Sequence, residues 1–182
     1  MNRREALEKV TLLLGGTMIG AQAFLSSSFT FPKDSDFLTA AQKVLLNEVG
    51  ETIFPATDTP GAKEADVAAF MSVIVADCYT PAEQQIFLAG IEKLEKTSHD
   101  TYGRSFLKLN PTERETLLTT IDKAHIAYMS ARKSGEPVHY FRMFKELTIS
   151  GYMTSEVGAV KFLEYNPAPG RYDGCTTEKP WH

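Results

Sequence analysis

Two pairs of side chains in the sequence have the types and the spacing needed to share a metal ion. Asp122 precedes His125 by three residues and Glu95 precedes His99 by four, so each pair would lie on one face of a helix. A di-iron centre in a helical bundle needs more, namely Glu-x-x-His on two helices and carboxylates from two others. The ordinary interpretation of the pairs is therefore a surface ion pair or a partly buried histidine. If one pair did bind a metal ion, the chain would be an independent metal-binding protein or enzyme that uses Asp122 and His125, with Glu95; we keep this as an alternative hypothesis.

The two cysteines of the chain, Cys78 and Cys175, could support nucleophilic or disulfide chemistry. Cys78 ends an apolar segment and is expected to be buried, whereas Cys175 lies in a glycine-flanked tail and is expected to be accessible. Three states stay open: a bond between the two cysteines, a bond from Cys175 to a partner chain, and two reduced thiols. No Gly-x-Ser-x-Gly or His-Glu-x-x-His motif is present in the sequence. We therefore predict no catalytic residue in this chain.

Residues 1–25 have the parts of an export signal: a short basic start, an apolar run and small residues near its end. The run is shorter than the roughly 20 residues that a membrane-spanning helix needs. The pair Arg3-Arg4 resembles a twin-arginine signal, which exports folded proteins, although Ala6 stands where phenylalanine is frequent. We predict twin-arginine export to the periplasm. General secretion and a retained helical anchor are the alternatives.

Residues 39–164 are predicted to form one helical domain behind a linker at residues 26–38. Three helix starts carry a capping-box pattern, in which a polar cap is followed three residues later by Gln or Glu; the caps are Thr39, Thr80 and Asn110. The expected helices cover residues 39–54, 62–78, 80–97, 110–133, 140–149 and 155–163, with loops at 57–61, 98–103 and 134–137. Their apolar residues recur at helical spacing, and no segment alternates as a strand does. The expected fold is an all-α bundle of five or six helices.

The composition limits the partners that the chain can have. The 182 residues are 43% hydrophobic and carry a formal net charge of −4. A nucleic-acid partner is not expected, because such proteins present a clustered basic surface. Glycine and proline gather in residues 165–182, which cannot form a regular helix and are expected to be an irregular tail. The glycines at 15, 16 and 20 lack the order of a dinucleotide-binding loop, so no bound cofactor is expected.

Three segments together resemble the small (third) subunit of gluconate 2-dehydrogenase and of related membrane-associated sugar dehydrogenases. They are the twin-arginine start, residues 53–62 (IFPATDTPGA), and residues 151–158 (GYMTSEVG) continuing through residues 165–175 (YNPAPGRYDGC). The resemblance implies a non-catalytic subunit. A larger flavoprotein of the glucose–methanol–choline type holds FAD and oxidises a sugar or glycoside, and a cytochrome c subunit with haem c commonly accepts the electrons.

The resemblance also implies how the complex is exported and where the subunits meet. The large partner often lacks an export signal, so the small subunit carries the folded pair across the membrane. Any membrane association is then indirect or made by the N-terminal segment. We expect the tail to supply the partner interface, because Tyr, Trp and Arg dominate binding energy when desolvated; its candidates are Tyr165, Arg171, Tyr172, Cys175 and Trp181. The alternative is a tail that folds back over its own bundle.

Overall fold

The computed structural model describes residues 37–165 and residue 175, and these residues contain helices and no strand. The elements are α2 (Ala40–Ile53), α3 (Val67–Cys78), α4 (Pro81–Tyr102), the 3-10 turn η1 (Phe106–Lys108), α5 (Pro111–Ala131), α6 (Tyr140–Thr154) and the π-helical turn η2 (Gly158–Phe162). The all-α class predicted from the sequence is therefore confirmed. The export signal with Arg3 and Arg4 lies outside the described residues.

The three predicted capping boxes are all present. In each, the cap side chain accepts a hydrogen bond from the backbone N–H three residues on, and the Gln or Glu side chain there accepts one from the cap backbone; the caps are Thr39, Thr80 and Asn110. Proline occupies the first position of α4 and α5, where no N–H is needed. Helix starts of this kind are local, so the sequence alone predicts them well.

Helix α3 begins at Val67, five residues later than predicted, because its start is capped from another helix. Asn47 on α2 accepts a hydrogen bond from the Ala68 N–H at 2.9 Å and donates one to Asp66 at 2.8 Å. Asp66 itself has a left-handed backbone, with φ of 47°, and gives no side-chain cap. Residues 62–66 form turns instead of helix. No capping signal precedes α3 in the sequence, since the capping group is twenty residues away.

Two further boundaries differ from the prediction, in the direction of longer helices. Helix α4 continues through most of the predicted loop at residues 98–103 and ends at Tyr102, where Gly103 forms the C-cap with a φ of 68° that suits glycine. Helix α6 continues past Ile149 to Thr154, with Gly151 inside it. A Cβ on Gly151 would lie 2.8 Å from the Phe70 ring on α3, so this glycine marks a close helix approach and not a helix end.

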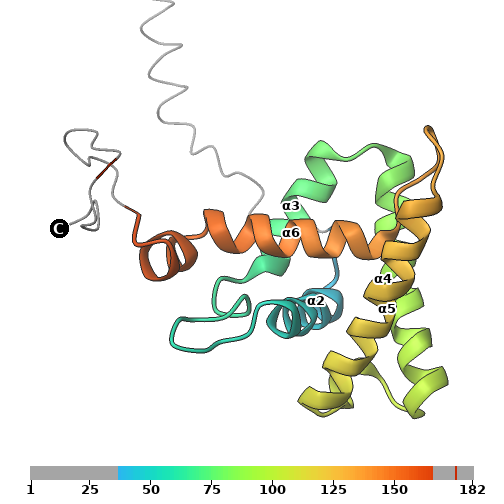
Figure 1. The fold of residues 1–182 in the computed structure, drawn as a ribbon, viewed down its shortest axis with the longest axis horizontal. Coiled ribbons are helices and arrows are strands. Elements are labelled where there is room, and N and C mark those ends of the chain that lie inside the picture. The colour runs from blue at the N-terminus through green and yellow to red at the C-terminus, as the bar shows by residue number, and fades with distance from the viewer. Residues whose placement is uncertain (1–36, 166–174, 176–182) are drawn as a thin grey trace, which may run out of the picture. The chain divides into compact units, whose positions relative to one another are not determined.

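The core is built around α6, which contacts α2, α3, α4 and α5 (Figure 1). Helices α4 and α5 both contact α6 and cross its N-terminal half in the view of Figure 1, and η2 lies at its C-terminal end. Eight residues of α6 are buried: Tyr140, Phe141, Met143, Phe144, Leu147, Thr148, Gly151 and Tyr152. Leu38, assigned to the linker from the sequence, is also buried. Among the described residues, none of the helices combines the length and the hydropathy needed to cross a membrane.

Candidate functional site

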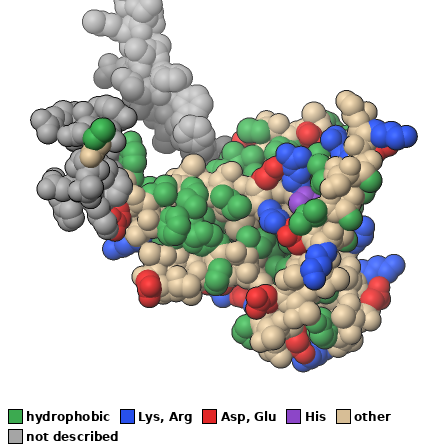
Figure 2. Space-filling model, in the orientation of Figure 1, with side chains coloured by type: hydrophobic (Ala, Val, Ile, Leu, Met, Phe, Trp, Pro, Cys, Tyr) green, Lys and Arg blue, Asp and Glu red, His purple; other side chains and the backbone are tan. Residues whose placement is uncertain are grey.

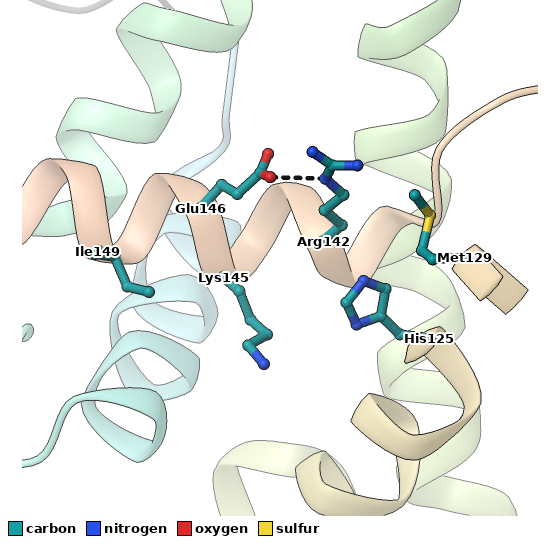
Figure 3. Close-up of a pocket in the computed structure, with 6 residues that line it drawn as sticks. All are labelled: His125, Met129, Arg142, Lys145, Glu146 and Ile149. Atoms are coloured by element: carbon teal, nitrogen blue, oxygen red, sulfur yellow. Dashed lines mark hydrogen bonds and ion pairs between the residues drawn. The ribbon is translucent and has the colours of Figure 1, made fainter. Parts of the chain in front are cut away.

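The first candidate site is an open groove between α5 and α6, with a volume of about 320 Å³ (Figure 3). His125 and Met129 line it from α5, and Arg142, Lys145, Glu146 and Ile149 line it from α6. Of its three charged residues from α6, Arg142 and Glu146 pair with each other at 2.6 Å and Lys145 pairs with Asp122 at 2.9 Å. The groove therefore combines an apolar floor with charges that are already neutralised.

Asp122 and His125, the predicted metal ligands, are brought together here but are held by a lysine. Lys145 Nζ lies 2.9 and 3.0 Å from the two carboxylate oxygens of Asp122, and His125 Nδ1 lies 3.1 Å from Oδ1. Burial raises the pKa of Asp122, but the hydrogen bonds from Lys145 and His125 outweigh it and leave this pKa below its ordinary value. The arrangement is an ion-paired cluster that joins α5 to α6. Lys145 was not foreseen, because it lies 23 residues from Asp122 in the sequence.

A stack of rings adjoins this cluster at the start of α6. His139 caps the helix, its Nδ1 accepting from the Phe141 N–H at 3.2 Å. Its ring centroid lies 4.5 Å from that of Tyr140 and 5.6 Å from those of His125 and Tyr128. Burial and the nearby charges of Lys93 and His125 lower the pKa of His139. A neutral imidazole is what the cap requires, because the protonated ring has no acceptor nitrogen.

The other metal-site candidates are not brought into this cluster. Glu95 and His99 lie on α4, and nowhere in the described part of the chain do three His, Cys, Asp or Glu side chains gather closely enough to hold a metal ion. The starts of α2, α4 and α5 are closed by their own capping boxes. Their N–H groups are thus partly engaged within the chain, which does not favour the binding of a cofactor phosphate there.

The second candidate site is the end of the bundle where two segments singled out from the sequence meet. Tyr152, from residues 151–158, donates its phenol hydrogen to the carbonyl of Pro60, from residues 53–62, at 2.7 Å. Its ring centroid lies 4.2 Å from that of Phe54. The carboxylate of Glu51 fixes the loop that follows α2, because it accepts hydrogen bonds from the N–H groups of Ala56 and Lys63 at 2.9 Å each. These segments therefore form one packed structure.

The π-helical turn η2 is placed on this structure by a sharp bend. Ser155 Oγ donates to the Tyr152 carbonyl at 2.7 Å and accepts from the Gly158 N–H at 3.0 Å. A Cβ on Gly158 would lie 1.9 Å from the Tyr152 carbonyl oxygen, so only glycine fits the bend. Phe162 then packs edge-on against Phe54, with ring centroids 5.3 Å apart. Turns of the π type are rare and frequently lie at functional sites.

The predicted interface residues fall partly within the described chain. Tyr165 and Cys175 are exposed, as an interface would require of them before binding. Arg171, Tyr172 and Trp181 lie outside the described residues. Cys78 was expected to be buried and this is wrong, because the last turn of α3 presents it to solvent. The pairing of Cys78 with Cys175 stays a prediction.

Comparison with known proteins decides the family. A family model described as Gluconate 2-dehydrogenase subunit 3 matches residues 40–170. The chain belongs to this family. No curated protein and no solved structure matched it.

The subunit 3 match covers every helix of the described structure and both packed segments at the bundle end. This chain is accordingly a subunit of a dehydrogenase complex, as the resemblance implied. Sequence reasoning missed Asn47, Glu51 and Lys145, which cap α3, hold the loop and neutralise Asp122. Each acts on a partner at least five residues away, so no local motif revealed it.

Proposed function

We propose that this chain is a non-catalytic small subunit of an exported FAD-dependent sugar or glycoside dehydrogenase. The observation that carries the proposal is the family match over residues 40–170, because a third subunit functions in a complex with others. The oxidation belongs to a larger flavoprotein of the glucose–methanol–choline type, which holds FAD. A cytochrome c subunit with haem c is the proposed electron acceptor.

The chemistry of the Asp122 cluster supports this division of labour. The Asp122 carboxylate, which a metal would need, is bound on both oxygens by Lys145. His125 donates from Nδ1 to the same carboxylate, and its ring lines an apolar groove. Such a cluster stabilises the contact between α5 and α6. It offers no base beside a nucleophile, which acid–base or covalent catalysis would require.

The role of the chain is then to escort and stabilise the flavoprotein. We propose that Arg3 and Arg4 direct the small subunit, with its folded partner, through twin-arginine export into the periplasm. Folded export suits a flavoprotein because its cofactor is inserted before it crosses the membrane. The tail residues Arg171, Tyr172 and Trp181 are proposed to contact the partner.

The proposal is tested by producing the large subunit with and without this chain and measuring flavoprotein and sugar-oxidising activity in the periplasm. Both are expected to fall strongly when the chain is absent. Unchanged periplasmic flavoprotein and activity in its absence would refute the escort role. A matched variant, Asp122→Asn, tests the non-catalytic assignment: we expect activity per bound flavin to stay at the wild-type value.

Non-reducing electrophoresis of the purified complex tests the state of the cysteines. A band that joins the two subunits in the wild type and in Cys78→Ser, but is lost in Cys175→Ser, would show a bond from Cys175 to the partner. If none of the three proteins gives this band, the chain has either a bond between Cys78 and Cys175 or two reduced thiols. Alkylation before and after reduction distinguishes these two states.

A further inference from the structure

The exposed apolar side chains of the described residues are concentrated at one end of the bundle. Four of the ten large hydrophobic side chains that are exposed in this part of the chain fall within six residues, namely Val160, Phe162, Leu163 and Tyr165. In Figure 2, hydrophobic side chains gather over η2 and the C-terminal end of α6. The other exposed hydrophobic residues are distributed over α2, α3, η1, α5 and α6. We call these four residues the end patch.

The end patch is held in place by the core beneath it. Phe162 packs against both Phe54 and Tyr152, with ring centroids 5.3 and 5.9 Å apart. The Leu163 N–H donates to the Gly158 carbonyl and the Tyr165 N–H donates to the Ala159 carbonyl, each at 2.9 Å. These bonds close the π-helical turn and present Val160 outward, with 56% of its surface exposed. A surface fixed in this way loses little conformational entropy on binding.

We propose that the end patch is the platform on which the larger, flavin-carrying dehydrogenase subunit docks, through an apolar surface of its own. The inference rests on the proposed function and names the surface that serves it. Exposed apolar patches of this kind mark interaction sites, because leaving them in water is unfavourable. Tyr165, itself part of the patch, is the last residue of the continuous described segment, so the tail proposed to contact the partner begins at the patch.

The two other occupants, the tail of the same chain and a second copy of the chain, would each give a different result. If the tail of the same chain covered the patch, a charge at Val160 would destabilise the isolated subunit and leave binding of the large subunit unchanged. If a second copy covered it, the isolated subunit would form a dimer that the same charge disrupts. The charged residues within and beside the patch, Glu156, Lys161 and Glu164, are exposed and of both signs, with a net charge of only −1, so they suit a mostly apolar partner surface.

The test compares Val160→Asp with Ile126→Asp, because both replace a β-branched side chain of nearly equal exposure, 56% and 55%. Ile126 lies on α5, which crosses the other half of α6 (Figure 1). Each full-length variant is tagged and produced with the large subunit in the native host. The readouts are the amount of large subunit retained per tagged chain and its flavin absorbance. Thermal unfolding of the isolated variants checks that both are folded, and Leu163→Asp serves if Val160→Asp is not.

We expect Val160→Asp to lower retention of the flavoprotein by about tenfold or more and Ile126→Asp to leave it near the wild-type value. Equal retention by both variants, or equal loss, would overturn the end patch as the docking surface. The proposal would also be overturned if Val160→Asp retained the large subunit normally and instead disrupted a dimer of the isolated subunit or lowered its stability. Failure of the wild-type chain to retain any flavoprotein would instead overturn the proposed function, so the two failures are distinguishable.

Discussion

Tyr152 and Pro60 are joined by a hydrogen bond of 2.7 Å although 92 residues separate them in the sequence. The Tyr152 side chain is buried, and its phenol reaches from α6 to the loop that follows α2. The bond thereby links residues 53–62 and 151–158, two of the segments that carry the family resemblance. Their distinctive residues thus have a structural reason, since they build the end of the bundle that supports η2.

The variant Tyr152→Phe is expected to lower the free energy of unfolding by about 1–2 kcal/mol, because it leaves the Pro60 carbonyl without this donor in a partly buried position. The matched control is Tyr128→Phe, whose phenol also donates to a proline carbonyl, that of Pro137 at 2.9 Å, but from an exposed side chain. Water can replace that bond, so the control is expected to cost less than about 0.5 kcal/mol. Urea denaturation measures both. Equal losses would show that burial of the Tyr152 bond has no added value.

The variant Gly158→Ala is expected to cost about 2 kcal/mol or more, because its Cβ would meet the rigid backbone carbonyl of Tyr152 and displace η2. The comparison variant is Gly103→Ala. A Cβ at residue 103 would have open space around it, so the only expected cost is the strain of alanine at a φ of 68°, about 1 kcal/mol. The same denaturation experiment ranks the two. A Gly158→Ala chain as stable as the wild type would contradict the described bend.

The stability of the chain is expected to fall as the pH falls below the ordinary pKa of histidine, 6.5. Burial, Lys93 and His125 lower the pKa of His139 in the folded state, so the unfolded chain takes up a proton first. The stabilisation that His139 contributes is therefore fully present above pH 6.5, the pKa of an ordinary histidine. It is lost as the pH falls through the lower pKa of His139 in the folded chain. Protonation of His139 would also remove the capping hydrogen bond from the Phe141 N–H, because an imidazolium has no nitrogen that can accept a hydrogen bond.

The variant His139→Asn tests this dependence, since asparagine caps helices and does not titrate. Urea denaturation at about pH 7.5 and about pH 5 should show a smaller loss of stability in the variant than in the wild type. The range avoids the carboxyl of Asp122, whose pKa is below its ordinary value. The same loss in both proteins would assign the dependence to other groups.

The double variant Arg3→Lys/Arg4→Lys is expected to retain the chain and its flavoprotein partner in the cytoplasm, because twin-arginine export requires the arginine pair. General secretion accepts a basic start of either kind. Cell fractionation with an assay for both subunits decides between the two routes. Normal periplasmic amounts of the double variant would identify general secretion and exclude the twin-arginine route.

The sequence by itself determined the helical class, the three capped helix starts and the family, because each depends on local pattern or on segments read directly from the chain. Capping boxes at Thr39, Thr80 and Asn110 act within four residues, so propensity and spacing are enough to find them. The tertiary structure alone decided the features that depend on distant partners: the start of α3, capped by Asn47, and the neutralisation of Asp122 by Lys145. It also decided that Cys78 is exposed and that the end patch is built on Tyr152 and Phe54. Such features arise when the helices pack and bring together residues that are far apart along the chain.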